Sequence, residues 1–180
     1  MNHKILAINP GSTSTKIAVY QNAKPVFLKS ILHDPKELSK YKRISDQYEF
    51  RKNIILKELK DSHIGIETIE VVVGRGGLIR PIESGVYNIN ERLRTDLLEG
   101  VMGEHASNLG GLIAHDIARD LPNCRAFIAD PVVVDELLDE RRQFIEGVFC
   151  HSLNSAKSPF SSMSGSLPGA VGLKSEPWTN

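Results

Sequence analysis

The sequence predicts an α/β domain whose mixed sheet begins with an antiparallel meander. Three short β-prone runs open the chain, at residues 4–8, 16–20 and 25–32. A polar stretch with helical spacing follows, and after it an apolar, β-branched run at residues 68–74 that is short enough to be a fully buried strand. Strands that give way to a helix and then to another buried strand are typical of a layered α/β fold.

The first two runs are joined by a turn whose composition suggests a binding role. Gly11 allows the backbone to come close to a ligand, and four hydroxyl residues follow it before Lys16 supplies a positive charge. Such a loop suits a phosphate or a metal–phosphate complex. The turn leads from strand to strand, so it is not a Walker A motif, and glycine and serine are also ordinary turn residues.

A helix is predicted to begin after Asp34, because an aspartate at the N-cap with Pro35 at the first helical position is a helix-start signal. Apolar and aromatic residues then recur at roughly helical spacing as far as Ser62: Leu38, Tyr41, Tyr48, Ile55 and Leu59. The many charged residues between them indicate a solvated face.

Arg75 lies among three glycines, at residues 74–77, where the buried strand ends. Glycines permit a tight turn and close backbone approach, and open α/β sheets bind ligands at the C-terminal edge of their strands. Arg75 is therefore a candidate to grip a carboxylate or phosphate with its bidentate guanidinium group. The alternative is a glycine-rich turn that carries a solvent-facing arginine.

Two more helices are expected after a short strand at residues 86–90. Asn90 can cap the first of them, over residues 91–98. The second carries a core-facing stripe: Leu109, Leu112, Ile113, Ile117 and Leu121. Gly110 and Gly111 inside this helix each cost about 1 kcal/mol relative to alanine, so we expect another part of the chain to approach the helix closely there.

Glu104, His105 and Asn108 gather at the start of that second helix, where backbone donors and the helix dipole attract anions. His105 could hydrogen-bond a phosphoryl oxygen or a carboxylate, and a local capping contact is the alternative. Asp130 follows another predicted strand, at residues 125–129, where a carboxylate can orient a metal or a nucleophile. It can also simply start an Asp-Pro turn.

Composition excludes several classes of function. Lys plus Arg (22) balances Asp plus Glu (22), so no basic field argues for nucleic acid or for an anionic membrane. No signal-peptide pattern opens the chain, and no apolar segment approaches the ~20 residues needed to span a bilayer. Two cysteines, Cys124 and Cys150, are most simply reduced thiols. The chain is expected to be cytoplasmic.

The composition changes sharply towards the C-terminus. Residues 155–180 are rich in Ser, Pro and Gly and show no period, so we expect a flexible tail there and one folded domain over residues 1–154.

Taken in order, these segments resemble the acetate and butyrate kinase family, and are nearest to its butyrate kinase branch. The resemblance is close from residue 3 to about residue 138. Five stretches carry it: INPGSTSTK (8–16), VVVGRGGLIRPIESGVY (71–87), GEHASNLGGLIAHDIA (103–118), FIADPVVVDEL (127–137) and HSLN (151–154). The resemblance implies a ribonuclease-H-like domain of the actin, hexokinase and Hsp70 type, with helices on both faces of the sheet.

The resemblance also implies roles for individual residues. The family pattern N-x-G-S-x-S-x-K falls on Asn9, Gly11, Ser12, Ser14 and Lys16, a phosphate-binding turn in which Asn9 sits near the metal–phosphate group. His105 matches a histidine that contacts the transition state, and His151 matches a second one. Asp130 matches an aspartate that helps to hold the metal and orient the acyl substrate. Arg75 is the candidate carboxylate clamp, although the acetate kinases have His-Gly-Gly at this point and an arginine a few residues earlier.

The implied reaction transfers the γ-phosphoryl group of ATP to butyrate or a related short-chain carboxylate, with Mg²⁺, and gives an acyl phosphate and ADP. A homo-oligomer is implied as well. The family has two such domains, and 180 residues are about half of what two would need at ~150 residues each. Two other readings therefore stay open: an inactive, truncated remnant without the nucleotide-binding domain, and a structural domain that pairs with another chain.

Overall fold

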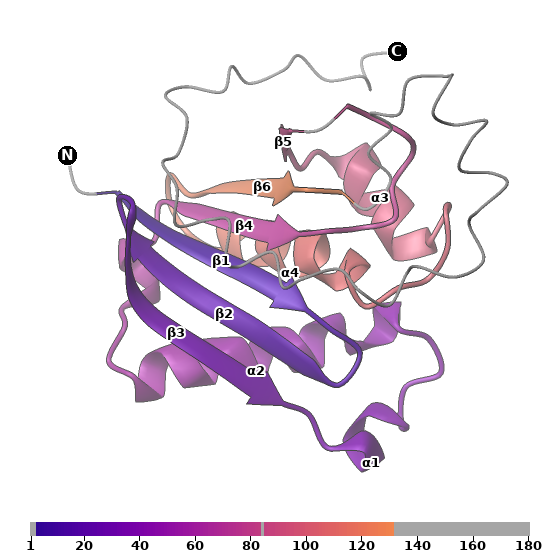
Figure 1. Cartoon of the computed structure of the whole chain (residues 1–180), viewed down its shortest axis with the longest axis horizontal. Helices are drawn as coiled ribbons and strands as arrows, with labels where there is room; N and C mark the ends of the chain where they lie inside the picture. The colour runs from indigo at the N-terminus through magenta and orange to yellow at the C-terminus, as the bar shows by residue number, and fades with distance from the viewer. Residues whose placement is uncertain (1–2, 84, 132–180) are drawn as a thin grey trace, which may run out of the picture.

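The computed structural model describes residues 3–83 and 85–131 and contains one six-stranded mixed sheet (Figure 1). The strands are β1 (Lys4–Pro10), β2 (Ser14–Gln21), β3 (Lys24–Leu32), β4 (Val71–Arg75), β5 (Val86–Asn88) and β6 (Arg125–Ala129). Their order across the sheet is β3-β2-β1-β4-β6-β5. The first three strands are antiparallel, β4 and β6 run parallel to β1, and β5 is antiparallel to β6. The predicted α/β class and the opening meander are confirmed.

The main helices lie behind this sheet, on a single face of it (Figure 1). They are α2 (Tyr48–Asp61), α3 (Glu91–Glu99) and α4 (Asn108–Arg119), while the short α1 (Pro35–Leu38) lies at the rim. Two single-turn 3₁₀ helices, η1 (Ser45–Gln47) and η2 (Ile66–Thr68), complete the set. Within the described residues, the expectation of helices on both faces is thus met on one face only. The proposed tail at residues 155–180 and His151 lie outside the described residues.

The predicted helix over residues 35–62 is interrupted, and this expectation was wrong. Asp34 does cap α1, since its Oδ1 accepts a hydrogen bond from the Lys36 amide at 2.9 Å. The chain then leaves the helical conformation before η1 and α2 begin. The reason is a long-range contact: the side chain of Arg43 reaches the carbonyl oxygens of Leu98 and Glu99 at the end of α3, both at 3.2 Å.

The predictions for the second half of the domain held more closely. Asn90 caps α3, because its Oδ1 accepts a hydrogen bond from the Leu93 amide at 2.9 Å. Strand β6 has the predicted bounds, and β5 is a short strand that ends two residues earlier than expected. Among the helices that the structure describes, none is long and apolar enough to cross a membrane.

The glycine pair in α4 has the close neighbour that the sequence predicted. A Cβ on Gly110 would lie 3.0 Å from the carbonyl oxygen of Arg75 and 3.3 Å from the ring of Pro10. On the strand side, a Cβ on Gly74 would overlap the carbonyl group of Gly110. Helix and strand therefore touch backbone to backbone, which draws the start of α4 against the C-terminal end of β4.

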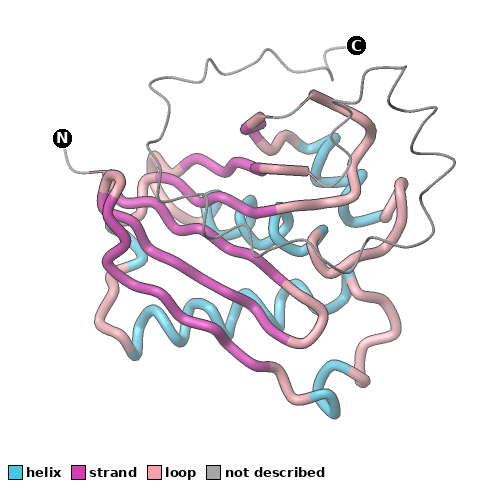
Figure 2. The backbone as a smooth tube through the Cα atoms, viewed as in Figure 1, coloured by secondary structure: helices cyan, strands magenta, loops and turns pink. Residues whose placement is uncertain are grey.

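Figure 2 shows the consequence for the loops. The turn after β1, the loop after β4 and the loop before α4 all lie at the end of the sheet to which β1 and β4 point. This is the edge at which sheets of this kind bind ligands.

We expect Gly74→Ala to lower the free energy of unfolding by about 1–3 kcal/mol, because the added methyl group must push α4 away from β4. Urea denaturation followed by circular dichroism measures the change. Gly11→Ala is the matched control, since a Cβ there meets nothing closer than the Ser14 carbonyl oxygen at 3.4 Å. It should change the free energy by less than about 0.5 kcal/mol. Equal losses in the two variants would contradict the close backbone contact.

Candidate functional site

Three polar side chains lie in one row across the sheet. Strand pairing places Asn9 of β1 opposite Lys16 of β2. The last pair between β1 and β4 is Ile8 with Gly74, so the residues that follow them, Asn9 and Arg75, lie side by side. Side chains alternate between the faces of a sheet, and Ile8 is fully buried on the helix face. The row of Lys16, Asn9 and Arg75 therefore faces the side on which the structure describes no helix. Lys16 is exposed, and the other two are half-buried.

Asp130 lies at the end of this row, directly after β6. Its Oδ2 is 4.0 Å from Nε of Arg75, and its side chain is 70% exposed. The residue has a positive φ of 48°, a conformation in which aspartate is several-fold enriched over other residues. The aspartate is thus more than a turn starter, because the turn places its carboxylate against the guanidinium group of Arg75.

The loop between β1 and β2 is a tight turn, closed by a hydrogen bond from the Gly11 amide to the Ser14 carbonyl oxygen at 2.7 Å. Ser12 is exposed, and Ser14 is half-buried. Gly11 has no left-handed conformation, and a Cβ would fit there without a clash. The loop that we predicted from composition exists, but Gly11 is not required by its backbone shape.

Arg51 of α2 supports this loop from inside, and the sequence analysis missed it. Its side chain is 1% exposed, and it donates hydrogen bonds to the carbonyl oxygens of Gly11 (2.7 Å) and Ser12 (3.0 Å). The signal available in the sequence was its position, because Arg51 lies three residues after Tyr48 and four before Ile55. It therefore occupies the apolar stripe of the helix, where an arginine needs buried partners.

His33 supports the base of the same loop. It is 5% exposed, and its Nε2 is 2.8 Å from Oγ1 of Thr15. Its ring packs against Phe50, with 5.8 Å between ring centroids. Burial, with a smaller contribution from the charge of Arg51, lowers the pKa of His33 to about 4. The imidazole is therefore neutral at neutral pH.

His105 belongs to the loop before α4 and is exposed. The Ser107 amide donates to its Nδ1 at 3.2 Å, and Ser107 Oγ is 2.7 Å from the same nitrogen. Because Nδ1 accepts from an amide, the neutral ring carries its proton on Nε2. The local contact that we considered as an alternative does exist, and it leaves Nε2–H as a donor without a partner among the described residues.

The same loop lies beside Arg75. A Cβ on Gly76, the next residue, would be 2.8 Å from Cβ of Ser107. His105 is therefore on the loop that flanks the end of the polar row.

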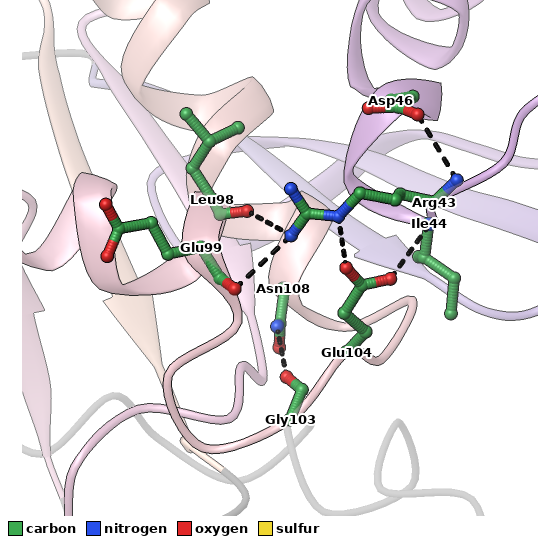
Figure 3. Close-up of polar contacts among 8 residues, drawn as sticks. All are labelled: Arg43, Ile44, Asp46, Leu98, Glu99, Gly103, Glu104 and Asn108. Carbon is green, nitrogen blue, oxygen red and sulfur yellow. Dashed lines mark hydrogen bonds and ion pairs between the residues drawn. The ribbon is translucent and has the colours of Figure 1, made fainter.

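Glu104 and Asn108 turn out to hold this loop in place (Figure 3). Glu104 accepts from Nε of Arg43 at 2.5 Å and from the Ile44 amide at 3.3 Å. The hydrogen bond from Arg43 lowers the pKa of the Glu104 carboxyl group. Asn108 donates to the Gly103 carbonyl oxygen at 2.9 Å and accepts from the Leu78 amide at 2.8 Å.

Metal ligands are few at this edge of the sheet. Over residues 3–83 and 85–131, no three His, Cys, Asp or Glu side chains come together in a way that could hold a metal ion. In the part of the chain that the structure describes, Asp130 is the carboxylate that lies against the polar row. The donor set fits a hard cation held largely by ligand phosphates and water, as Mg²⁺ often is, and does not form an all-protein cage.

The chain is similar to two curated proteins of Clostridium acetobutylicum. It is 55% identical to butyrate kinase 2 over 142 residues, which cover 79% of this chain and 40% of that protein. It is 53% identical to butyrate kinase 1 over 135 residues, which cover 75% of this chain and 38% of that protein. The chain is a homologue of the butyrate kinases. The resemblance to the acetate and butyrate kinase family is confirmed. The chain spans about two fifths of the length of these relatives.

Two solved structures also show similarity to part of the chain. Acetate kinase from Entamoeba histolytica matches with a TM-score of 0.40 and 18% identity, over 71% of this chain and 34% of that one. Acetate kinase from Porphyromonas gingivalis matches with a TM-score of 0.43 and 18% identity, over 71% of this chain and 37% of that one. No family model matches the chain.

The free energy of unfolding is expected to fall as the pH is lowered from about 6.5 to about 4, by up to about 3 kcal/mol from His33 alone. In the folded chain His33 resists protonation, whereas in the unfolded chain it takes up a proton below pH 6.5, so acid favours unfolding. Urea denaturation at several pH values measures this. His33→Gln cannot titrate and should show a shallower decline. The same decline in both proteins would contradict the assignment.

Proposed function

We propose that this chain supplies one wall of the active site of a short-chain carboxylate kinase, which transfers the γ-phosphoryl group of ATP to butyrate. The observation that carries the proposal is the polar row of Lys16, Asn9 and Arg75, which ends at Asp130. It occupies the ligand-binding edge of a sheet in a homologue of butyrate kinases. The choice of butyrate over other short-chain carboxylates rests on the similarity to these relatives.

The chemistry asks little covalent work of the protein. A carboxylate oxygen attacks the γ-phosphorus and forms the new O–P bond, while the bond from that phosphorus to the β–γ bridging oxygen breaks and ADP leaves. A carboxylate is already ionised at pH 7, so no general base is required. Positioning and neutralisation of the charge on the equatorial oxygens do most of the catalytic work. A site of cations and neutral donors suits this need.

Each residue then has a role that its surroundings support. Lys16 is exposed at the loop and supplies a point charge to phosphate oxygens. Arg75 is 35% exposed and can present its fork to the substrate carboxylate or to the transferred group. His105 offers Nε2–H from the flanking loop, which suits a hydrogen bond to a phosphoryl oxygen. Ser12 and Ser14 add hydroxyl groups, and Asn9 adds an amide.

Mg²⁺ bound with ATP would bring positive charge to the transferred phosphoryl group. Asp130 is the described residue best suited to contact it, directly or through water, and Asn9 supplies the amide side chain of the row. Asp130 also lies beside Arg75 in the absence of ligand, because its Oδ2, directly after β6, is 4.0 Å from Nε of the arginine at the end of β4.

ATP-dependent formation of butyryl hydroxamate, measured when the purified chain is given butyrate and hydroxylamine, tests the proposal. Lys16→Met and Arg75→Met should each lower kcat/KM by about 10²–10³, because each removes a charge that stabilises the transition state. Lys24→Met is the matched control and should leave the rate unchanged. Lys24 is an exposed lysine at the start of β3, at the end of the sheet that lies away from the polar row.

The outcomes separate the alternatives. Turnover that survives both site substitutions would contradict the assigned roles. No turnover at high enzyme concentration, with phosphate still bound, would favour the inactive remnant, and neither turnover nor binding would favour a structural or interaction domain.

A further inference from the structure

Arg51 makes an unusual set of hydrogen bonds beneath the loop between β1 and β2. Its guanidinium group donates to three carbonyl oxygens of the loop, those of Gly11 at 2.7 Å, Ser12 at 3.0 Å and Ser14 at 3.4 Å. It also donates to Oγ1 of Thr15 at 3.3 Å and to Oε1 of Gln47 at 2.9 Å. A lysine could not reach so many acceptors, because its donors radiate from a single nitrogen.

All these partners are uncharged. No carboxylate within the described residues forms an ion pair with Arg51, although its side chain is 1% exposed. Burial lowers the pKa of Arg51 to about 10, which still leaves the group protonated at neutral pH. The loop therefore rests on a buried positive charge that no carboxylate of residues 3–83 and 85–131 neutralises.

The direction of the carbonyl groups fixes the direction of the amides. In a trans peptide the C=O and the N–H point in opposite directions, and the described chain has no cis peptide. The carbonyls of Gly11 and Ser12 point at Arg51, so the amides of Ser12 and Thr13 point away from it. Neither amide donates to a protein acceptor in the described residues. Successive outward amides in a turn are one of the arrangements in which backbone donors can bind an anion.

We propose that Arg51 is a positioning residue for an anion site, holding the loop so that the amides of Ser12 and Thr13 bind a phosphate group. The inference rests on the proposed function and deepens it, because it names the backbone donors that would face the phosphate and the side chain that sets them. Lys16 lies two residues beyond the turn and is exposed, so it adds positive charge to the anion site from the solvent side. Arg51 acts from the buried side and touches no ligand.

The competing view is that Arg51 only stabilises the fold. The two views differ in one observable, since a purely structural arginine would change stability without changing how the loop responds to phosphate. Lys52 offers a matched control on the same helix. It is the next residue, its side chain is 13% exposed, and its Nζ is 3.5 Å from Oδ2 of Asp116, away from the loop.

The experiment titrates inorganic phosphate into the ¹⁵N-labelled chain and follows backbone amide resonances. In the wild-type chain the amides of Ser12 and Thr13 should show the largest shifts. Arg51→Met should weaken phosphate binding by at least about tenfold and abolish these shifts, because the loop loses both its fork and its charge. Lys52→Met should bind phosphate within about twofold of the wild type, even where it loses a similar amount of stability. Arg51→Lys retains the charge but not the fork, and should bind with intermediate affinity.

The results separate this inference from the proposed function. Wild-type binding that Arg51→Met leaves unchanged would overturn the role of Arg51 and leave the carboxylate kinase proposal standing. If phosphate binding to the wild-type chain shifts the resonances of other amides but not those of Ser12 and Thr13, the anion site and the role of Arg51 are overturned. This result does not depend on any variant folding. Binding with the expected shifts but without butyrate-dependent turnover would sustain the anion site while the kinase proposal fails.

Discussion

The contact between the backbones of Gly74 and Gly110 is the constraint on which the site depends. A side chain at either position would separate α4 from β4, and the loop that carries His105 would move with the helix. Because the two backbones touch, the helix start is fixed relative to the end of the strand. Arg75 follows Gly74 directly, so the same contact places the arginine and the histidine loop at one edge of the sheet.

Two arginines then fix the loops that regular structure leaves free. Arg51 binds the carbonyls of the turn after β1, and Arg43 binds the carbonyls at the end of α3 together with Glu104. A guanidinium group suits this work, since its donors lie in a rigid plane and can satisfy several acceptors at once. The difference lies in burial. Arg43 is exposed and paired with a carboxylate, whereas Arg51 is buried among neutral acceptors and projects its charge into the loop.

Local signals in the sequence were sufficient for most of the fold. The meander follows from three β-prone runs, the start of α3 from the cap at Asn90, and the helix–strand contact from glycines that a helix would otherwise avoid. The break after α1 was not predictable in this way, because it depends on Arg43 reaching the end of α3, more than 50 residues away. Likewise, the sequence placed Arg75, His105 and Asp130 near strand ends or helix starts, but periodicity could not reveal that Glu104 and Asn108 bind the protein and not a ligand.

The exposure of the polar row bears on how such a site could work. Lys16 is exposed, and Arg75 and Asp130 are partly or largely so, hence their fields are weakened by water. Two unit charges 4 Å apart interact by about 1 kcal/mol in water and by about 4 kcal/mol at an effective dielectric constant of 20. The buried charge of Arg51 is shielded less by water, so it acts on the loop even while the polar row is open to solvent. A carboxylate kinase built on this row would gain the remaining stabilisation only when another surface excludes water from its open face.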